Sequence, residues 1–191
     1  MRVLSLITPF ILTTMVKRIL LIALFAVAYS LPSMAQVEEA AFKNAFMGSY
    51  DAANGKIVQL AMAFTEDQYD WRPSEGVRSV KEALMHIANA NVAFAGMLGG
   101  EVPESLKGRN LEKDVTSKED AIKVLKESIA ASQKAVKDLN AAAMSEKVDW
   151  FDGSKMPKLN LVMVVNDHAQ EHLGQLIAYA RSQDVTPPWS N

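Results

Sequence analysis

The chain has 191 residues, of which 49% are hydrophobic and 22% charged. This fits one globular domain with a sizeable core and excludes a wholly disordered chain. Twenty Lys and Arg residues stand against twenty-two Asp and Glu, so the basic surface that binds phosphates is lacking and we expect no nucleic-acid partner. The absence of Cys excludes disulfides, thiolate zinc sites and cysteine nucleophiles. Any metal must be held by His and carboxylate side chains.

The N-terminal segment has the pattern of a secretory signal. A basic pair precedes an apolar run over residues 19–28, and small residues follow that run. Basic, apolar and small-residue regions in this order are typical of a signal peptide, with cleavage before Gln36. We therefore predict a signal peptide over residues 1–35 and an exported domain, periplasmic or secreted, over residues 36–191, with no membrane span after cleavage.

Two alternatives concern this segment. Residues 3–28 are mostly apolar, as in an uncleaved membrane anchor, but Lys17 and Arg18 interrupt the stretch and the remaining run is short for a span. Met15 lies just before the basic pair and is an alternative start of translation, which would make residues 1–14 an upstream extension.

Two amphipathic helices are predicted in the first half of the domain. Residues 38–64 carry apolar side chains at three- and four-residue intervals with polar residues between them, the pattern of a helix with one buried face. Ser79 and Glu82 have the Ser-x-x-Glu spacing of a capping box. A second helix should therefore begin near Val80 and end at about Leu98, before two glycines.

A third helix is predicted after a polar segment. Either Thr116 with Glu119 or Ser117 with Asp120 has the spacing that begins a helix, and an apolar stripe then continues to Leu139.

A fourth helix is predicted near the C-terminus. Pro157 suits its first turn, and apolar residues share one face with His168 and His172 as far as Arg181. Two prolines stop the chain from continuing as a helix, and Trp189 beyond them is expected to pack back on the body.

No segment shows sustained alternation of apolar and polar residues, so no sheet is predicted. The fold class is all-α, a four-helix bundle. The connection over residues 99–117 is long for a link between helices, and a long link permits a crossover to a parallel neighbour. We therefore predict an up-down-down-up topology with this crossover between the second and third helices.

The chain has three His residues, His86, His168 and His172. The last two are four positions apart on one helix, a spacing that lets both imidazoles reach one ion. His86 lies on another helix beside alanines, whose small side chains let a neighbouring helix come close, and bundle cores build metal sites from facing helices. The alternative is that each His is an ordinary half-buried or exposed residue with a hydrogen-bond partner.

A site of three neutral imidazoles has a definite chemistry. It leaves a coordination position open for water or substrate, as catalytic metal sites require. Water on such an ion has its pKa lowered to about 7, which supplies hydroxide at neutral pH. Zinc, nickel and iron all suit imidazole ligands, and the sequence does not choose between them.

The segments around these histidines carry a family pattern. They are Trp71-Arg72-Pro73 and the capping box before His86, the stretch Asp167-His168-x-x-x-His172-Leu173-Gly174-Gln175-Leu176, and the ending Pro187-Pro188-Trp189. Together they resemble the DinB-like family of damage-inducible proteins over almost the whole mature chain. The resemblance implies a four-helix bundle, one divalent metal held by His86, His168 and His172, and often a homodimer. Some relatives are transferases and isomerases that use cytosolic thiols, a cosubstrate that the export signal argues against.

Other polar residues near the histidines have candidate roles. His168 to His172 also reads as His-x-x-Glu-His, the inverted zinc-protease motif, in which Glu171 would be the general base. Because the chain is short and helical, we keep Glu171 only as a weak catalytic candidate. A ligating His usually donates its second N–H to an oxygen, and Glu171, Asp167, Asn89 and Gln175 are candidates to accept it. Solvated or capping roles remain the alternative for each.

Two aromatic loop segments precede the second and fourth helices. Trp71 lies in the first, and Trp150 and Phe151 form the second. They are placed where a pocket over a metal would be lined, but aromatics at such positions more often close the end of a bundle core, which is the role we expect.

The sequence therefore predicts an exported, DinB-like protein that binds a divalent metal and acts as a metal-dependent hydrolase or transferase on a small-molecule substrate. The alternative from another class is a non-catalytic metal-binding or interaction module on the same bundle.

Overall fold

The computed structural model describes residues 34–190. The predicted signal peptide lies outside the described residues, apart from Met34 and Ala35. Contacts divide the chain into two units, Met1–Glu38 and Glu39–Asn191, and the bundle belongs to the second. Within the described part, no helix is both long enough and apolar enough to cross a membrane.

Four long helices and several short elements make up the described residues. The long helices are α2 (Met34–Ala63), α3 (Val80–Met97), α5 (Lys118–Asp138) and α7 (Lys158–Ser182). The short elements are η1 (Asp67–Asp70), η2 (Glu104–Leu106), α4 (Leu111–Asp114), α6 (Ala141–Ser145), β1 (Lys147–Asp149) and β2 (Lys155–Pro157).

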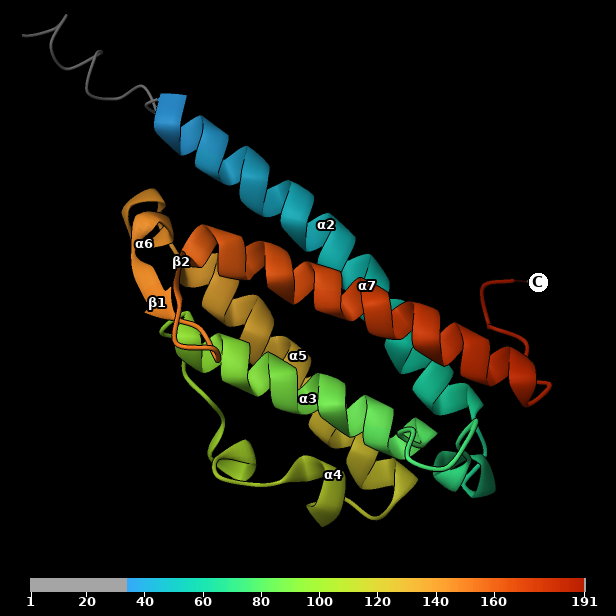
Figure 1. Cartoon of the computed structure of the whole chain (residues 1–191). Helices are drawn as coiled ribbons and strands as arrows, with labels where there is room; N and C mark the ends of the chain where they lie inside the picture. The colour runs from blue at the N-terminus through green and yellow to red at the C-terminus, as the bar shows by residue number, and fades with distance from the viewer. Residues whose placement is uncertain (1–33, 191) are drawn as a thin grey trace, which may run out of the picture. The chain divides into compact units, whose positions relative to one another are not determined.

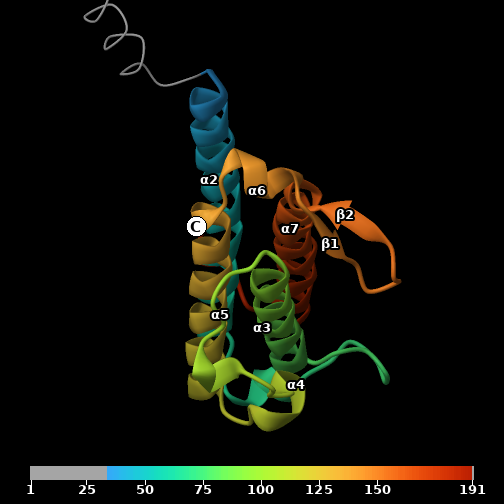
Figure 2. The same cartoon turned by 90° about the vertical axis from the view of Figure 1, so that its left-hand side faces the viewer.

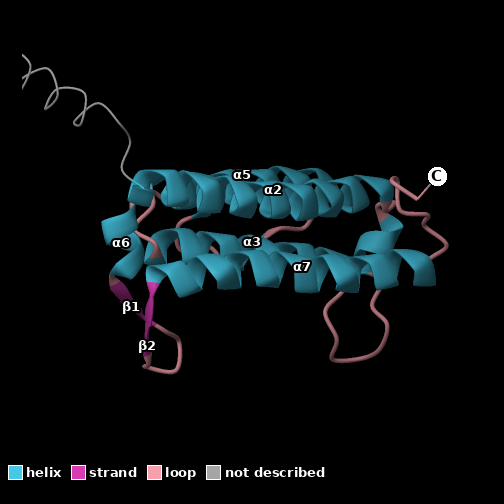
Figure 3. Ribbon diagram, turned by 90° about the horizontal axis from the view of Figure 1, so that it is seen from above, coloured by secondary structure: helices cyan, strands magenta, loops and turns pink. Residues whose placement is uncertain are grey.

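The long helices form an up-down-down-up bundle, as predicted. Helices α2 and α7 run in one direction, whereas α3 and α5 run in the other (Figure 1). Viewed from the end and from above, α2 with α5 and α3 with α7 form two layers (Figures 2 and 3). The parallel neighbours α3 and α5 pack closely, and the long crossover that joins them contains η2 and α4.

Side-chain caps set where two of the helices begin. The Ser79 hydroxyl accepts from Glu82 N–H and the Glu82 carboxylate accepts from Ser79 N–H, so the predicted capping box is present. At α5 the Ser117 hydroxyl accepts from Asp120 N–H, which decides between the two predicted starts. Both caps satisfy amides that the first helical turn leaves free.

Two glycines end α3 and begin the crossover. Gly99 has φ +88°, a left-handed conformation that favours glycine after a helix. A Cβ on Gly100 would lie 2.5 Å from the Cβ of Ala135 on α5, so only glycine lets the two helices approach there.

The prediction that the chain has no sheet is wrong at one place. Strand β1 pairs antiparallel with β2, with Val148 opposite Met156, and the hairpin lies beside the start of α7 (Figure 2). Its turn contains Gly153 at φ +84°. Three residues a strand are too few for an alternating pattern to be recognised, so this hairpin escapes a search for periodicity.

The core also holds a polar group of three residues, here called the core polar cluster. Tyr50 donates to Asn91 Oδ1 at 3.0 Å, Asn91 donates to Ser128 Oγ at 3.3 Å, and Ser128 donates to the Leu125 carbonyl at 2.8 Å. The cluster links α2, α3 and α5. Beyond α7, Trp189 packs against the core, with the Lys56 ammonium 5.4 Å from its ring centroid.

Candidate metal centre

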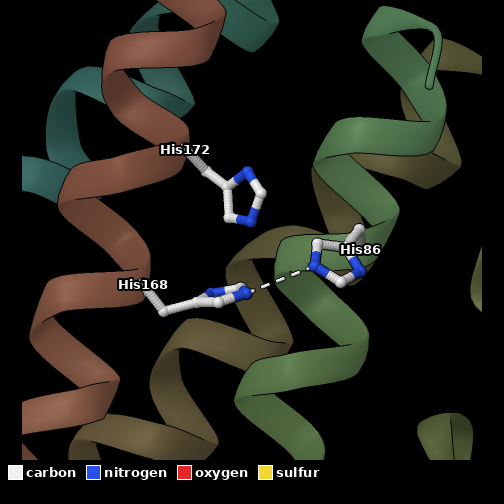
Figure 4. Close-up of side chains that lie close together, drawn as sticks. All are labelled: His86, His168 and His172. Carbon is white, nitrogen blue, oxygen red and sulfur yellow. Dashed lines mark hydrogen bonds between the residues drawn. The ribbon is translucent and has the colours of Figure 1, made fainter. Parts of the chain in front are cut away.

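The three histidines of the chain meet between α3 and α7. His168 and His172 project from successive turns of α7 toward His86 on α3 (Figure 4). One ring nitrogen from each lies within 4.8 Å of the others, and Nε2 of His168 is 3.3 Å from Nε2 of His86. The helical spacing of four residues puts both rings on one face of α7, and the packing of α3 on α7 supplies the third ring.

A relay of hydrogen bonds sets the tautomer of His172. The Tyr179 hydroxyl donates to the Arg78 carbonyl at 3.0 Å, and Gln175 Nε2 donates to that hydroxyl at 2.9 Å. Gln175 Oε1 therefore faces His172 Nδ1, at 2.7 Å, and only an N–H on Nδ1 satisfies it. Because the carbonyl can only accept, the direction of the whole relay is determined. His172 Nε2 is left with a bare lone pair that points at the other rings.

The crossover supplies the corresponding contact to His86. Glu112, on α4, has Oε1 3.5 Å from His86 Nδ1, and its other oxygen accepts from Arg78 Nε at 3.1 Å. A carboxylate at Nδ1 favours the proton on that nitrogen and leaves Nε2 free for the centre. Sequence reasoning missed Glu112, since it lies in a connection with no spacing relation to any His.

The electrostatics of the cluster favour the neutral form of His86 and His168. Burial, above all, lowers the pKa of His86, and Arg78 and His172 lower it further, against the opposing effect of Glu112. Burial, with His172, His86 and Arg78 nearby, lowers the pKa of His168 to about 4. Neutral imidazoles are the form that binds metal ions.

The donor set fits a divalent transition metal ion. Three nitrogen lone pairs converge, and two of the rings have their second nitrogen occupied by an oxygen partner, as is usual for ligating His. Within the described residues no protein donor is hydrogen-bonded to His172 Nε2. A cation between the rings would bind all three nitrogen lone pairs. A proton on one nitrogen could form a hydrogen bond to only one of the other two.

A cleft of about 390 Å³ opens beside His86 and His168. Helix α3 lines it with residues spaced three, four, seven and eight positions after His86, and α7 adds Val164, four before His168. The full lining is His86, Asn89, Ala90, Ala93, Phe94, Trp150, Phe151, Val164 and His168. The cleft therefore reaches two of the three imidazoles from one side.

The family model of the DinB superfamily matches residues 49–176. The chain belongs to the DinB superfamily. The match covers α3, α5, the second half of α2 and the part of α7 that carries both histidines. Among proteins of curated function, none matches this chain significantly.

Solved structures of DinB-like proteins share the fold of this family member. A DinB-like protein from Bacillus cereus has a TM-score of 0.64 and 19% identity, over 75% of this chain and 93% of that one. YfiT from Bacillus subtilis has a TM-score of 0.59 and 14% identity, over 82% of this chain and 93% of that one. YfiT is described as a probable metal-dependent hydrolase with an unusual four-helix bundle topology. At these identities the likeness concerns the fold.

The other predicted site residues of this DinB-superfamily chain separate into two groups. Gln175 is hydrogen-bonded to His172 and Asn89 lines the cleft. Asp167 and Glu171 are exposed on α7, and in the described structure neither is hydrogen-bonded to an imidazole. Helical geometry explains the difference, because a residue three after His172 shares its face and one directly before it does not.

The expected role of the second aromatic segment is wrong in part. Trp150 packs on the core, but Phe151 is 71% exposed and both residues line the cleft. The hairpin, which the sequence did not reveal, carries them to the mouth of the cleft. Trp71 does cover the core, with its ring edge-on to Tyr179 at 5.4 Å. Of the alanines expected to admit a neighbouring helix, Ala83 is buried, whereas Ala90 and Ala93 leave room for the cleft.

Proposed function

We propose that this protein is a metal-dependent enzyme in which His86, His168 and His172 hold one divalent transition metal ion, zinc, nickel or iron. The observation that carries the proposal is the convergence of three ring nitrogens beside an open cleft, with two of the opposite ring nitrogens held by Gln175 and Glu112. Structural metal sites are closed by protein ligands, whereas catalytic sites keep an open position. The cleft on the His86 and His168 side is where a small-molecule substrate would reach the centre.

The chemistry divides between the ion and the chain. A divalent ion with three imidazole ligands supplies Lewis-acid chemistry and makes hydroxide available near neutral pH. The Gln175 relay and Glu112 hold His172 and His86 in the ligating tautomer, and the apolar walls of the cleft exclude bulk water from the substrate. Hydrolysis of a small molecule is the reaction class we favour over group transfer, which is in keeping with the description of YfiT as a probable metal-dependent hydrolase.

A non-catalytic metal-binding module is the second candidate. Of the described residues that line the cleft, none is a carboxylate, so no acidic side chain there is placed as a general base. In an enzyme, removing the metal abolishes turnover, and in a module it lowers only the free energy of unfolding. Assaying the metal-loaded and chelator-treated protein against a panel of small esters and amides separates the two.

The test of the metal centre is the metal content of untagged mature protein, measured by elemental mass spectrometry. We expect about one equivalent of a transition metal, lost in the variant with all three His changed to Ala. Glu171→Gln, one residue from His172 but exposed, is the matched control and should keep its metal. No bound metal, even after incubation with zinc, nickel and iron salts, would overturn the proposal.

We further propose that the protein is exported, on the signal pattern of residues 1–35. Expression of the full chain in a bacterium, followed by cell fractionation and N-terminal sequencing, should give a periplasmic or secreted product that begins at Gln36. An intact N-terminus in the cytoplasmic fraction would contradict this.

A further inference from the structure

The cleft beside the histidines has a marked chemical character. Apart from His86 and His168, Asn89 is the one polar residue among the described residues that line it, and Lys, Arg, Asp and Glu are absent from that lining. A charged ligand would lose its hydration there and find no opposite charge in return, which is costly. The cleft therefore disfavours ionic groups away from the histidines.

Aromatic rings continue from the histidines to the surface. His168 meets Phe94 edge-on at 5.6 Å, Phe94 stacks with Trp150 at 6.3 Å and 12°, and Trp150 meets Phe151 at 4.7 Å. Phe94 is 4% exposed at one end and Phe151 71% at the other. Here this series of rings is called the aromatic wall.

Small residues also line the cleft on α3. Ala90 and Ala93 lie on α3 one and two turns after His86, so their methyl groups leave the space that larger side chains would fill. A volume of about 390 Å³ is in the range of small-molecule sites and far too small for a protein partner. One planar ring fits this volume, in contact with the aromatic wall and in the space that the alanines leave.

Hydrogen bonds hold in place the hairpin that carries Trp150 and Phe151 of the wall. Trp150 N–H donates to the Ser154 carbonyl at 2.7 Å, and Ser154 N–H donates to the Asp152 carboxylate at 2.8 Å. At its base, Lys158 N–H donates to the Glu146 carbonyl at 2.8 Å, and the side chains of the same two residues pair at 2.8 Å. Phe151 is thus exposed on a turn that hydrogen bonds hold closed, so its ring stays at the edge of the cleft that it lines.

We propose that the substrate of this centre is a small molecule that carries an uncharged aromatic ring next to a metal-binding oxygen group. The proposal rests on the proposed metal centre and adds the class of molecule that it takes. The oxygen group faces His86 and His168, and the ring packs on the aromatic wall in the space that Ala90 and Ala93 leave.

The experiment uses two hydroxamates with the same chelating group. Benzohydroxamate and acetohydroxamate are titrated by calorimetry into zinc-loaded mature protein. Burial of the phenyl ring should make benzohydroxamate bind about tenfold more tightly or better. Equal affinities would overturn the aromatic preference while leaving the metal centre in place.

Two variants assign the preference to the cleft. Phe151→Ser removes the exposed end of the wall, and Ala93→Leu fills part of the cleft. Each should lower the benzohydroxamate affinity about threefold or more and leave that of acetohydroxamate unchanged. The matched control is Met163→Ser, because Met163 is another exposed large apolar residue, 46% accessible, outside the lining. An unchanged ratio in both cleft variants, with native circular dichroism, would overturn the proposal.

A second arm does not depend on the metal. Saturation-transfer NMR on the metal-free protein compares benzamide with acetamide. A benzamide signal that Ala93→Leu removes would support the aromatic cleft even if no metal is bound, so that the proposed function alone fails. Absence of that signal, together with equal hydroxamate affinities, would reject the aromatic cleft.

Discussion

Two groups of buried polar residues in this bundle are both chains of hydrogen bonds, but only one of them is satisfied without a ligand. In the core polar cluster, donors run from Tyr50 through Asn91 and Ser128 to the Leu125 carbonyl. In the candidate metal centre, donors run from His172 through Gln175 and Tyr179 to the Arg78 carbonyl. A backbone carbonyl, which can only accept, sets the direction of both relays.

The first residue of each relay makes the difference. The core polar cluster begins at the phenol of Tyr50, whose only proton is donated to Asn91. The cluster is therefore complete without a ligand. The relay of the metal centre begins at the imidazole of His172, which still has a lone pair on Nε2. That lone pair faces the rings of His86 and His168. A buried polar group that is satisfied within the protein stabilises the fold, whereas one with convergent unpaired lone pairs needs a ligand. Four predictions separate the two groups.

The largest expected effect is on metal binding. His168→Ala or His172→Ala removes one of three ligands, so we expect the metal content to fall to less than about a tenth of that of the native protein. Elemental mass spectrometry measures it, and circular dichroism should show an unchanged helical content. Full occupancy in either variant would remove that residue from the ligand set.

The partners of the ligands should matter less than the ligands. Gln175→Leu or Glu112→Leu leaves one ring without the partner that holds its tautomer, which should weaken metal affinity about tenfold to a hundredfold. Competition with a chromophoric chelator measures the affinity. Glu104→Leu, on the same crossover but exposed, is the matched control. If all three variants bind alike, the oxygen partners do not tune the centre.

The metal-free protein should lose stability in mild acid. His168 has a pKa of about 4 in the folded chain and about 6.5 when unfolded, so between these values only the unfolded state takes up its proton. Stability therefore falls as the pH drops from 6.5 to 4. With solvent screening at the exposed edge of the ring, we expect about 2 kcal/mol.

Urea unfolding with a chelator present, from pH 7 to pH 4, measures this loss. The His168→Ala variant lacks the group and should have a shallower pH dependence over the same window. Equal slopes for the two proteins would mean that His168 is not held neutral by the fold.

The smallest effect should come from the core polar cluster. Tyr50→Phe deletes a buried donor and leaves Asn91 Oδ1 without it, so the free energy of unfolding should fall by about 1–2 kcal/mol. Metal content should stay at the native value, because the cluster does not touch the histidines. Loss of metal in this folded variant would mean that the two groups are coupled through α3.

Much of this fold could be read from local patterns. The Ser79 capping box predicted where α3 begins, and the capping pairs at Thr116 and Ser117 predicted the start of α5 to within one residue, because these signals lie within one turn of chain. The length of the crossover predicted the parallel pair. The hairpin around Gly153 was missed because its strands are only three residues long.

The sequence by itself determined the bundle, its topology and the pairing of His168 with His172, since each follows from helical spacing or connection length. Only the tertiary structure decided the rest. It brought His86 opposite that pair, placed Glu112 and Arg78 behind the rings, and set Phe151 at the mouth of an apolar cleft. These contacts join residues far apart in the chain, and the distance between them is set by how whole helices pack, which no local pattern encodes.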